Sequence, residues 1–418
     1  MDYRKISPLS HSTYFERYAY PERFIREPMA PNTFLSVVIP VYNEENLLKT
    51  LQSLDACVAP QFPVEVILVV NFPEEDSEDV IKTSFKTLNE IESFKKTQKS
   101  PFLTIRSIEA FSLAKKQAGV GLARKIGMDE ATYRFSKANI DGVIVCFDAD
   151  SECDKNYLIT IENYFLTHAD CTAASIHFEH PLYENEKLNE PIILYELHLR
   201  YYVQALKHAE YPYAFHTIGS SMAVKSSIYQ KQGGMNTRKA GEDFYFLHKV
   251  IPLGNYRNIT STKVIPSARK SDRVPFGTGR AMKNYEEDES ALLYSYNFKI
   301  FEELKLFINL VETEEFPQNC NFKILQFLKD NDFEESIERI KTQAKNKKHF
   351  KERFFQWFNG FRALKFVHYF RDAYYPNILL VEATSILFSN IKDLTAFSLE
   401  HSAHQQLLHL RAYEKENP

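Results

Sequence analysis

The stretch Val143-Ile-Val-Cys-Phe-Asp-Ala-Asp150 decides how this sequence is read, because an apolar run ends abruptly in two carboxylates at positions i and i+2. Apolar runs of this length are typical of buried strands in a sheet that is covered on both faces. In open α/β sheets the ligand site lies just beyond the carboxyl ends of the strands. Two acids placed there are costly unless they bind a cation or a polar ligand. Asp148 and Asp150 are therefore the first candidate site residues.

Outward from this stretch, strand-like and helix-like segments alternate. Apolar, β-branched runs occur at 35–41, 64–70, 102–108 and 142–147, and segments with helical spacing lie between them at 44–54, 77–96 and 121–135. Strands that alternate with helices predict a mostly parallel sheet. We therefore expect an α/β fold with a Rossmann-like, doubly wound, mostly parallel sheet.

The rest of the chain predicts two further regions. Residues 1–33 are polar and aromatic with several prolines, and we expect a surface extension with one short helix. From 285 to 418 the pattern is helical, with amphipathic spacing at 291–311, 322–340, 350–369 and 377–399. The predicted division is an extension at 1–33, an α/β domain at 34–284 and an α-helical region at 285–418.

Composition narrows the function classes. The 418 residues are 44% hydrophobic and 25% charged, with a net charge of −4, which is ordinary for a soluble globular protein and gives no case for a nucleic-acid partner. The five cysteines show no C-x-x-C spacing. We see neither a signal peptide nor an apolar run long enough to span a membrane. These features lead us to expect a cytoplasmic protein.

Several motifs fall where a sheet would place a site. Pro40-Val-Tyr-Asn-Glu-Glu45 follows the first strand, where a dehydrogenase or a P-loop enzyme would have a glycine-rich loop. The segment from Gly119 to Gly127 reads as a loop that enters a helix, with Arg124 available to a diphosphate; a solvated basic helix face is the alternative.

Two later motifs add acidic residues and arginines. Glu242 and Asp243 follow Gly241, and they are either the charged first turn of a helix or a supported general base. The segment 269–280 is rich in arginine and glycine, which suits a mobile loop that closes over an anion or a basic surface loop. On the first reading, Arg273 or Arg280 contacts that anion.

The motifs PVYNEENLLKTLQSL, GVGLARKIGMDEA, CFDAD and GEDFYFL appear in that order. Together they resemble the family 2 glycosyltransferases, which have the GT-A fold, over roughly residues 34–282. The resemblance implies that Asp148 contacts the nucleotide and that Asp150, together with Asp148, binds Mg²⁺ or Mn²⁺ on the diphosphate. It also implies that Asp243 is the catalytic base of an inverting enzyme; the adjacent Glu242 is the predicted support. The resemblance matches Tyr42, Glu44 and the end of the second strand, at Asn71, to the nucleotide-base pocket. With Pro40, Gly119, Arg124, Arg273 and Arg280, these residues make up the predicted nucleotide-sugar site, in which Arg273 or Arg280 assists the leaving group.

The chain departs from the family pattern at two places. After the second strand it has Asn71-Phe-Pro-Glu-Glu-Asp-Ser77 in place of the usual Ser-x-Asp turn, and the Gln-x-x-Arg-Trp motif of processive synthases is absent. We therefore expect a single-addition transferase that moves a sugar from a nucleotide-diphosphate sugar, expected to be a UDP-sugar, to a hydroxyl acceptor in glycan, glycolipid or polysaccharide biosynthesis. The alternatives are a retaining GT-A transferase, in which a histidine such as His248 is a metal ligand, and an inactive nucleotide-binding scaffold.

The helical region combines many aromatic residues between Phe350 and Phe370 with lysines and arginines. This combination is typical of peripheral contact with the inner face of a membrane. The simpler interpretation, which we favour, is a helical core with solvated charges. A role of these helices in the acceptor site or in a dimer contact stays open.

Overall fold

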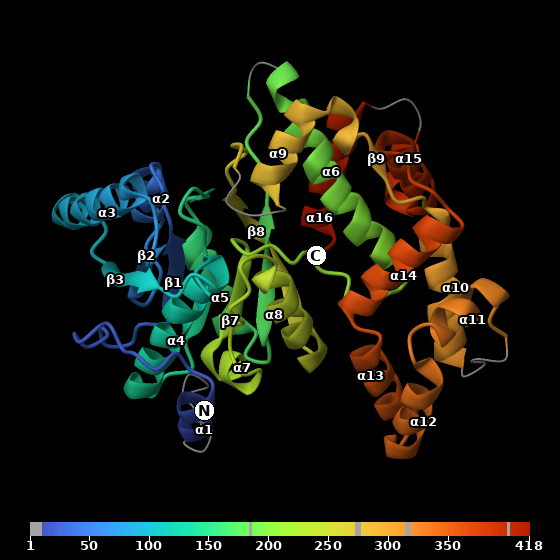
Figure 1. Ribbon diagram of the computed structural model, residues 1–418, viewed down its shortest axis with the longest axis horizontal. Coiled ribbons are helices and arrows are strands. Elements are labelled where there is room, and N and C mark those ends of the chain that lie inside the picture. The colour runs from blue at the N-terminus through green and yellow to red at the C-terminus, as the bar shows by residue number, and fades with distance from the viewer. Residues whose placement is uncertain (1–10, 184–185, 272–276, 314–318, 399–401) are drawn as a thin grey trace.

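The computed structural model describes residues 11–183, 186–271, 277–313, 319–398 and 402–418. An α/β body and a helical body lie side by side (Figure 1). The predicted α/β class, with a mostly parallel sheet followed by a helical C-terminal region, is confirmed.

The α/β body is built on an eight-stranded sheet in the order β3-β2-β1-β4-β7-β6-β8-β5. Strands β1 to β4, β6 and β8 run parallel, whereas β7 and β5 run antiparallel to their neighbours. The strands are β1 (Leu35–Val41), β2 (Val64–Pro73), β3 (Leu103–Leu113), β4 (Val143–Cys146), β5 (Glu152–Cys153), β6 (Ala173–Phe178), β7 (Met222–Lys225) and β8 (Tyr256–Ile265).

Alternation along the strands divides the apolar side chains between two faces. In β1, Val37 and Ile39 pack on one face and Val38 on the other. Apolar residues of α2 (Leu47–Asp55), α3 (Glu78–Thr97) and α5 (Tyr157–Thr167) cover the first face. Those of α1 (His11–Arg17), α4 (Val120–Ala138), α7 (Ser226–Lys231) and α8 (Glu242–Val250) cover the second. Both faces are buried, which explains the continuous apolar runs in the sequence.

Helix α4 lies close against the sheet. A Cβ atom at Gly127 would come within 2.5 Å of a methyl group of Val38, so only glycine allows this approach. The N-terminal extension packs on the far side of α4, where Tyr14 and Tyr229 both donate hydrogen bonds to Asp129. The position of α4 places its first turn at the carboxyl ends of the strands.

The helical body comprises α9 (Thr278–Glu287), α10 (Lys299–Thr313), α11 (Phe322–Lys329), α12 (Phe333–Gln343), α13 (Lys347–Trp357), α14 (Gly360–Ala373), α15 (Leu380–Asn390) and α16 (Ala403–Glu416), with short 3₁₀ turns at 289–292 and 392–397 and a small β9–β10 pair (Tyr294–Ser295 and Ile378–Leu379). A further 3₁₀ turn, at 251–253, follows α8 in the α/β body. The amphipathic segment 322–340 forms two helices, because Asp332 takes a positive φ of 53° and separates α11 from α12. The segment 350–369 is also divided between two helices, because Asn359 caps a new helix.

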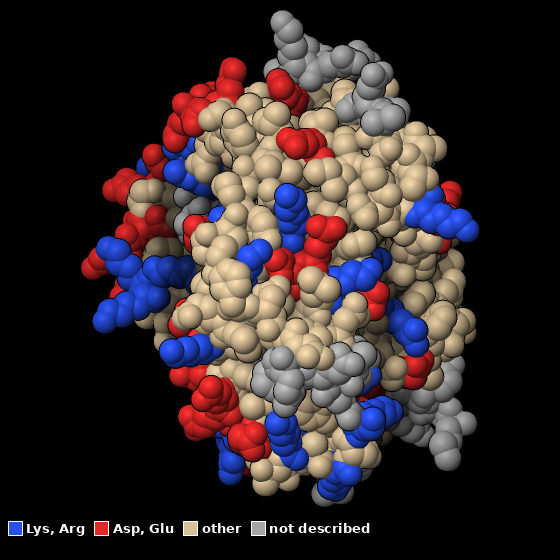
Figure 2. Space-filling model, turned by 90° about the vertical axis from the view of Figure 1, so that its right-hand side faces the viewer, with Lys and Arg blue, Asp and Glu red and all other residues tan. Residues whose placement is uncertain are grey.

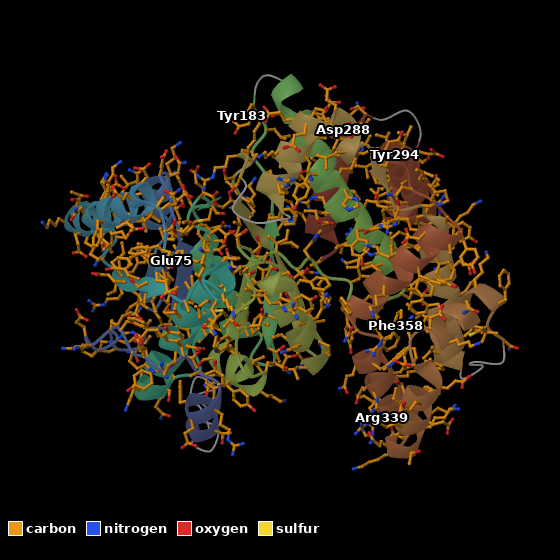
Figure 3. All side chains as sticks on the ribbon, in the orientation of Figure 1. Glu75, Tyr183, Asp288, Tyr294, Arg339 and Phe358 are labelled. Carbon is orange, nitrogen blue, oxygen red and sulfur yellow. The ribbon has the colours of Figure 1, made fainter. Side chains whose placement is uncertain are left out.

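Helix α6 (Glu186–His208) comes from the middle of the sequence but packs in the core of the helical body. That core also buries most of the aromatic residues of 350–370, as predicted, and Phe358 lies at the junction of α13 and α14 (Figure 3). A buried ionic network joins α6 to α16. Arg200 contacts Glu196 and Glu414, and Arg411 bonds Glu196 at 2.7 Å.

The surface over the helical body carries basic and acidic side chains in small, interspersed groups (Figure 2). Among the described residues, none of the helices combines the length and the apolar character required to cross a lipid bilayer.

Candidate active site

A large cavity lies between the carboxyl ends of the strands and the helical body. Its volume is about 1150 Å³, and Asp148, Asp150 and Asp243 all line it. The first two follow β4, and Asp243 lies in the first turn of α8. Three carboxylates that are distant in sequence therefore converge on one cavity.

Arg124 bridges two of the acids. Its guanidinium is buried and donates to Asp148 at 2.5 Å and to Glu242. A Cβ atom at Gly219 would collide with this guanidinium, so the loop before β7 leaves room for it. Burial raises the pKa of Glu242 to about 7 even though Arg124 opposes the shift. Glu242 therefore titrates near neutral pH.

Arg269 holds a second pair of acids. It lies at 2.9 Å from Asp150 and also pairs with the buried carboxylate of Glu44. Glu44 in turn accepts a hydrogen bond from the Asn46 backbone, which shapes the loop between β1 and α2. This cation was not singled out from the sequence. A signal was available, since Arg269 follows the end of β8 just as Asp148 follows the end of β4.

The carboxylate of Asp243 faces the cavity beside these pairs. It accepts a hydrogen bond of 2.7 Å from the backbone N–H of Phe244. Burial is the largest influence on its pKa, which lies above the ordinary value, and the charge of Asp148 acts in the same direction. A carboxylate with a raised pKa accepts a proton more readily than an ordinary one.

The structure brings most of the predicted donor residues into the same cavity. Pro40, Tyr42, Glu44, Asn71, Gly119 and Arg124 all line it. The amide of Asn71 donates to the carbonyls of Val41 and Val69, and the hydroxyl of Tyr42 bonds Asp76 at 2.9 Å.

The two predicted loop arginines are not in this group. Arg273 lies outside the described residues. Arg280 lies on α9 and is not among the residues that line the described cavity.

The opposite side of the cavity is formed by helices. We call it the helical wall, and it consists of the cavity-lining residues of α6, of residues 211–218 and of α14: Tyr195, His198, Leu199, Tyr202, Val203, Leu206, Tyr211, Tyr213, Phe215, His216, Thr217, Ile218, Gly360, Phe361, Ala363 and Leu364. From the sequence, a role of the C-terminal helices in the acceptor site was left open, but α6 was not predicted to join them.

The acids provide oxygen donors of the kind that Mg²⁺ and Mn²⁺ prefer. Within the described parts of the chain, however, no three His, Cys, Asp or Glu side chains converge as a ready-made metal site. Asp148 and Asp150 fit a hard divalent cation by donor type, and both are held by arginines. His248 lies on α8 against the ring of Phe244.

Comparison with known proteins identifies the α/β body. A family model described as "Glycosyl transferase family 2" matches residues 36–233, which include both acids after β4. The chain carries a family 2 glycosyltransferase domain. The enzyme class predicted from the sequence, a glycosyltransferase, is thereby confirmed.

Structural relatives of this glycosyltransferase are distant. It is similar to S. aureus TarS 1–349 in complex with UDP, with 12% identity and a TM-score of 0.40 over 92% of this chain and 89% of that chain. The same S. aureus protein in complex with UDP-GlcNAc gives 15% identity and a TM-score of 0.40 over the same shares. None of the curated proteins compared with the chain matches it.

Proposed function

We propose that this protein is an inverting, metal-dependent glycosyltransferase that moves a sugar from a UDP-sugar to a hydroxyl acceptor. The observation that carries the proposal is that Asp148, Asp150 and Asp243 line one cavity, and that the first two belong to residues 36–233, which match the family 2 glycosyltransferase model. Five free, buried thiols support a location in the reducing cytoplasm.

The residues that line the cavity serve two tasks, which are proton transfer from the acceptor and binding of the nucleotide. Asp243 takes the proton of the acceptor hydroxyl, since its carboxylate faces the cavity and has a raised pKa. Glu242 and Arg124 position the site around it through their buried pair. Tyr42 and Asn71 line the end of the cavity at β1 and β2, where the nucleotide would bind.

A divalent cation would bind at Asp150, with Asp148 near it, and would supply charge neutralisation for the diphosphate as it leaves. Because no complete set of protein ligands surrounds Asp150 in the described residues, the remaining ligands would come from the diphosphate and water. Arg269 pairs with Oδ2 of Asp150, so this arginine competes with a cation for the carboxylate.

Calorimetry with UDP, GDP and Mn²⁺ tests the donor, followed by a transfer assay with a panel of UDP-sugars. We expect UDP to bind only weakly without Mn²⁺ and tightly with it. NMR of the product distinguishes inversion from retention at the anomeric carbon. Failure to bind any nucleotide in the presence of metal would contradict the proposal and favour a scaffold.

A further inference from the structure

We propose that the acceptor carries its reactive hydroxyl on an uncharged, apolar body, and that the helical wall binds this body. The inference deepens the proposed function, on which it rests. It concerns the part of the cavity that faces Asp243 from the helical body.

Charge is divided sharply between the two sides of the cavity. The charged lining residues belong to the α/β body, and they include Asp148, Asp243 and Arg269. Within the described part of the helical wall there is no Asp, Glu, Lys or Arg. A diphosphate or an anionic acceptor would find no counter-charge there, and leaving a charge unpaired in such surroundings is costly.

Two of the histidines at the wall, His198 and His248, do not restore charge; a third, His216, lies 3.3 Å from the carboxylate of Glu414. Burial lowers the pKa of His198 to about 4, and it lowers the pKa of His248 to about 4 as well. Both imidazoles are therefore neutral at pH 7. The wall thus combines aliphatic side chains, such as Leu199 and Leu364, with aromatic rings.

The polar atoms of the wall are largely engaged within the protein. The hydroxyl of Tyr211 donates to the carbonyl of Phe358 at 3.1 Å. The Nδ1 atom of His198 lies 2.8 Å from the hydroxyl of Ser295. A glycan buried against this wall would leave several hydroxyls without partners, at about 1–3 kcal/mol each. An apolar body avoids that cost.

One polar side chain at the edge of the wall has no partner among the described residues. Both ring nitrogens of His248 are buried and lack hydrogen bonds, and Gly360 of α14 packs directly on the imidazole. His248 lies on the same helix as Asp243. It is placed to bond the polar head of an acceptor whose body lies along α14.

The wall also has an aromatic rim. Phe361 is 40% exposed, although it lines the cavity, and its ring lies 6.1 Å from that of Tyr245. Exposed apolar groups at the edge of a cavity favour an amphiphilic ligand that enters with its apolar end.

Calorimetric titration of the full chain with methyl, hexyl and octyl β-D-glucoside, below the micelle concentration, tests the proposal. Each buried methylene should tighten binding about fourfold, so octyl glucoside should bind about 15-fold more tightly than hexyl glucoside. Methyl glucoside and maltotriose should not bind measurably. Binding that is independent of chain length, or stronger for maltotriose, would overturn the inference. Phenyl β-D-glucoside binding more tightly than the hexyl compound would support it with a ring as the apolar body.

Two variants locate the site. Leu364→Lys places a charge in the wall and should weaken octyl glucoside binding more than tenfold. The matched control is Leu408→Lys, which changes a leucine on α16 that is 45% exposed and does not line the cavity, and its binding should be unchanged. Equal binding by both variants would refute the assignment.

Binding of UDP with Mn²⁺ is measured on every sample. If Leu364→Lys retains it, the variant is folded. Nucleotide binding that fails in the wild type while octyl glucoside still binds would reject the proposed function alone.

Discussion

Replacing Arg124 with methionine removes the cation between Asp148 and Glu242 and keeps most of the apolar volume. The side chain of Glu242 is 4% exposed, so an ionised Glu242 would lose its partner in the interior and would bind a proton instead. Breaking an ionised buried pair costs about 3–5 kcal/mol, and protonation of the carboxyl reduces that cost. Loss of the contact between Arg124 and Asp148 adds less to this cost, because the side chain of Asp148 is 39% exposed and solvent screens its charge.

The cost should depend on pH, because the pKa of Glu242 is about 7 in the native protein and near its ordinary value in the unfolded chain. Since the folded pKa is raised, the stabilising contribution of this group is full below about pH 4.5 and is lost as the pH rises through 7. Without Arg124 the pKa rises further and the glutamate stays protonated. The loss should therefore be about 1.4 kcal/mol greater at pH 8 than at pH 6.

Urea denaturation, followed by far-ultraviolet circular dichroism at pH 6 and pH 8, measures the loss in the free energy of unfolding and its dependence on pH. Arg257→Met is the control, because Arg257 forms an exposed pair with Asp170 at 3.2 Å and its loss should cost less than about 1 kcal/mol at either pH. The double variant Arg124→Met/Glu242→Gln should recover much of the loss at pH 8. An equal loss at both pH values would refute the reasoning about Glu242.

The remaining predictions concern catalysis and the helical body. Asp243→Asn should lower kcat by about 10²–10⁴-fold while UDP binding with Mn²⁺ persists, and an unchanged transfer rate would remove Asp243 from the mechanism. Arg269→Gln should tighten binding of Mn²⁺ alone several-fold, since it frees Asp150 from a competing cation; weaker binding in calorimetry would contradict this. Glu414→Gln should destabilise the protein by about 3–5 kcal/mol at pH 7, because it leaves Arg200 partly unpaired in the core. The arginine pairs hold the pKa values of Glu196 and Glu414 below their ordinary range, so this stability is present above about pH 4.5 and is lost as the pH falls below it, which acid unfolding would reveal.

Local pattern was sufficient to predict the parallel part of the sheet and the acids at its edge. The four predicted strands are present. β1, β2 and β4 are buried on both faces and their sequences are almost continuously apolar, whereas β3 is an edge strand in which buried and partly exposed residues are mixed. Strands β2 and β3 extend beyond the predicted ends, to Pro73 and Leu113, because pairing between the two strands continues past the apolar runs.

Contacts between residues that are distant in the sequence could not be predicted from this local pattern. The partners of the acids, Arg124 for Asp148 and Arg269 for Asp150, follow from how separate loops meet at the sheet edge. The breaks before α12 and α14 depend on single residues whose local conformation overrides the amphipathic period. The roles of Asp150, Asp243 and the donor residues stay predictions.

Helix α6 has a consequence for protein engineering. It is encoded between two strands of the sheet, yet its apolar face completes the core of helices that follow the last strand of that sheet in the sequence. A chimera that takes only residues 285–418 from a relative would pack the new helices against the α6 helix of the original protein, with which they did not evolve. Successful grafts should carry residues 186–208 along with them, so the helical module is discontinuous in the gene.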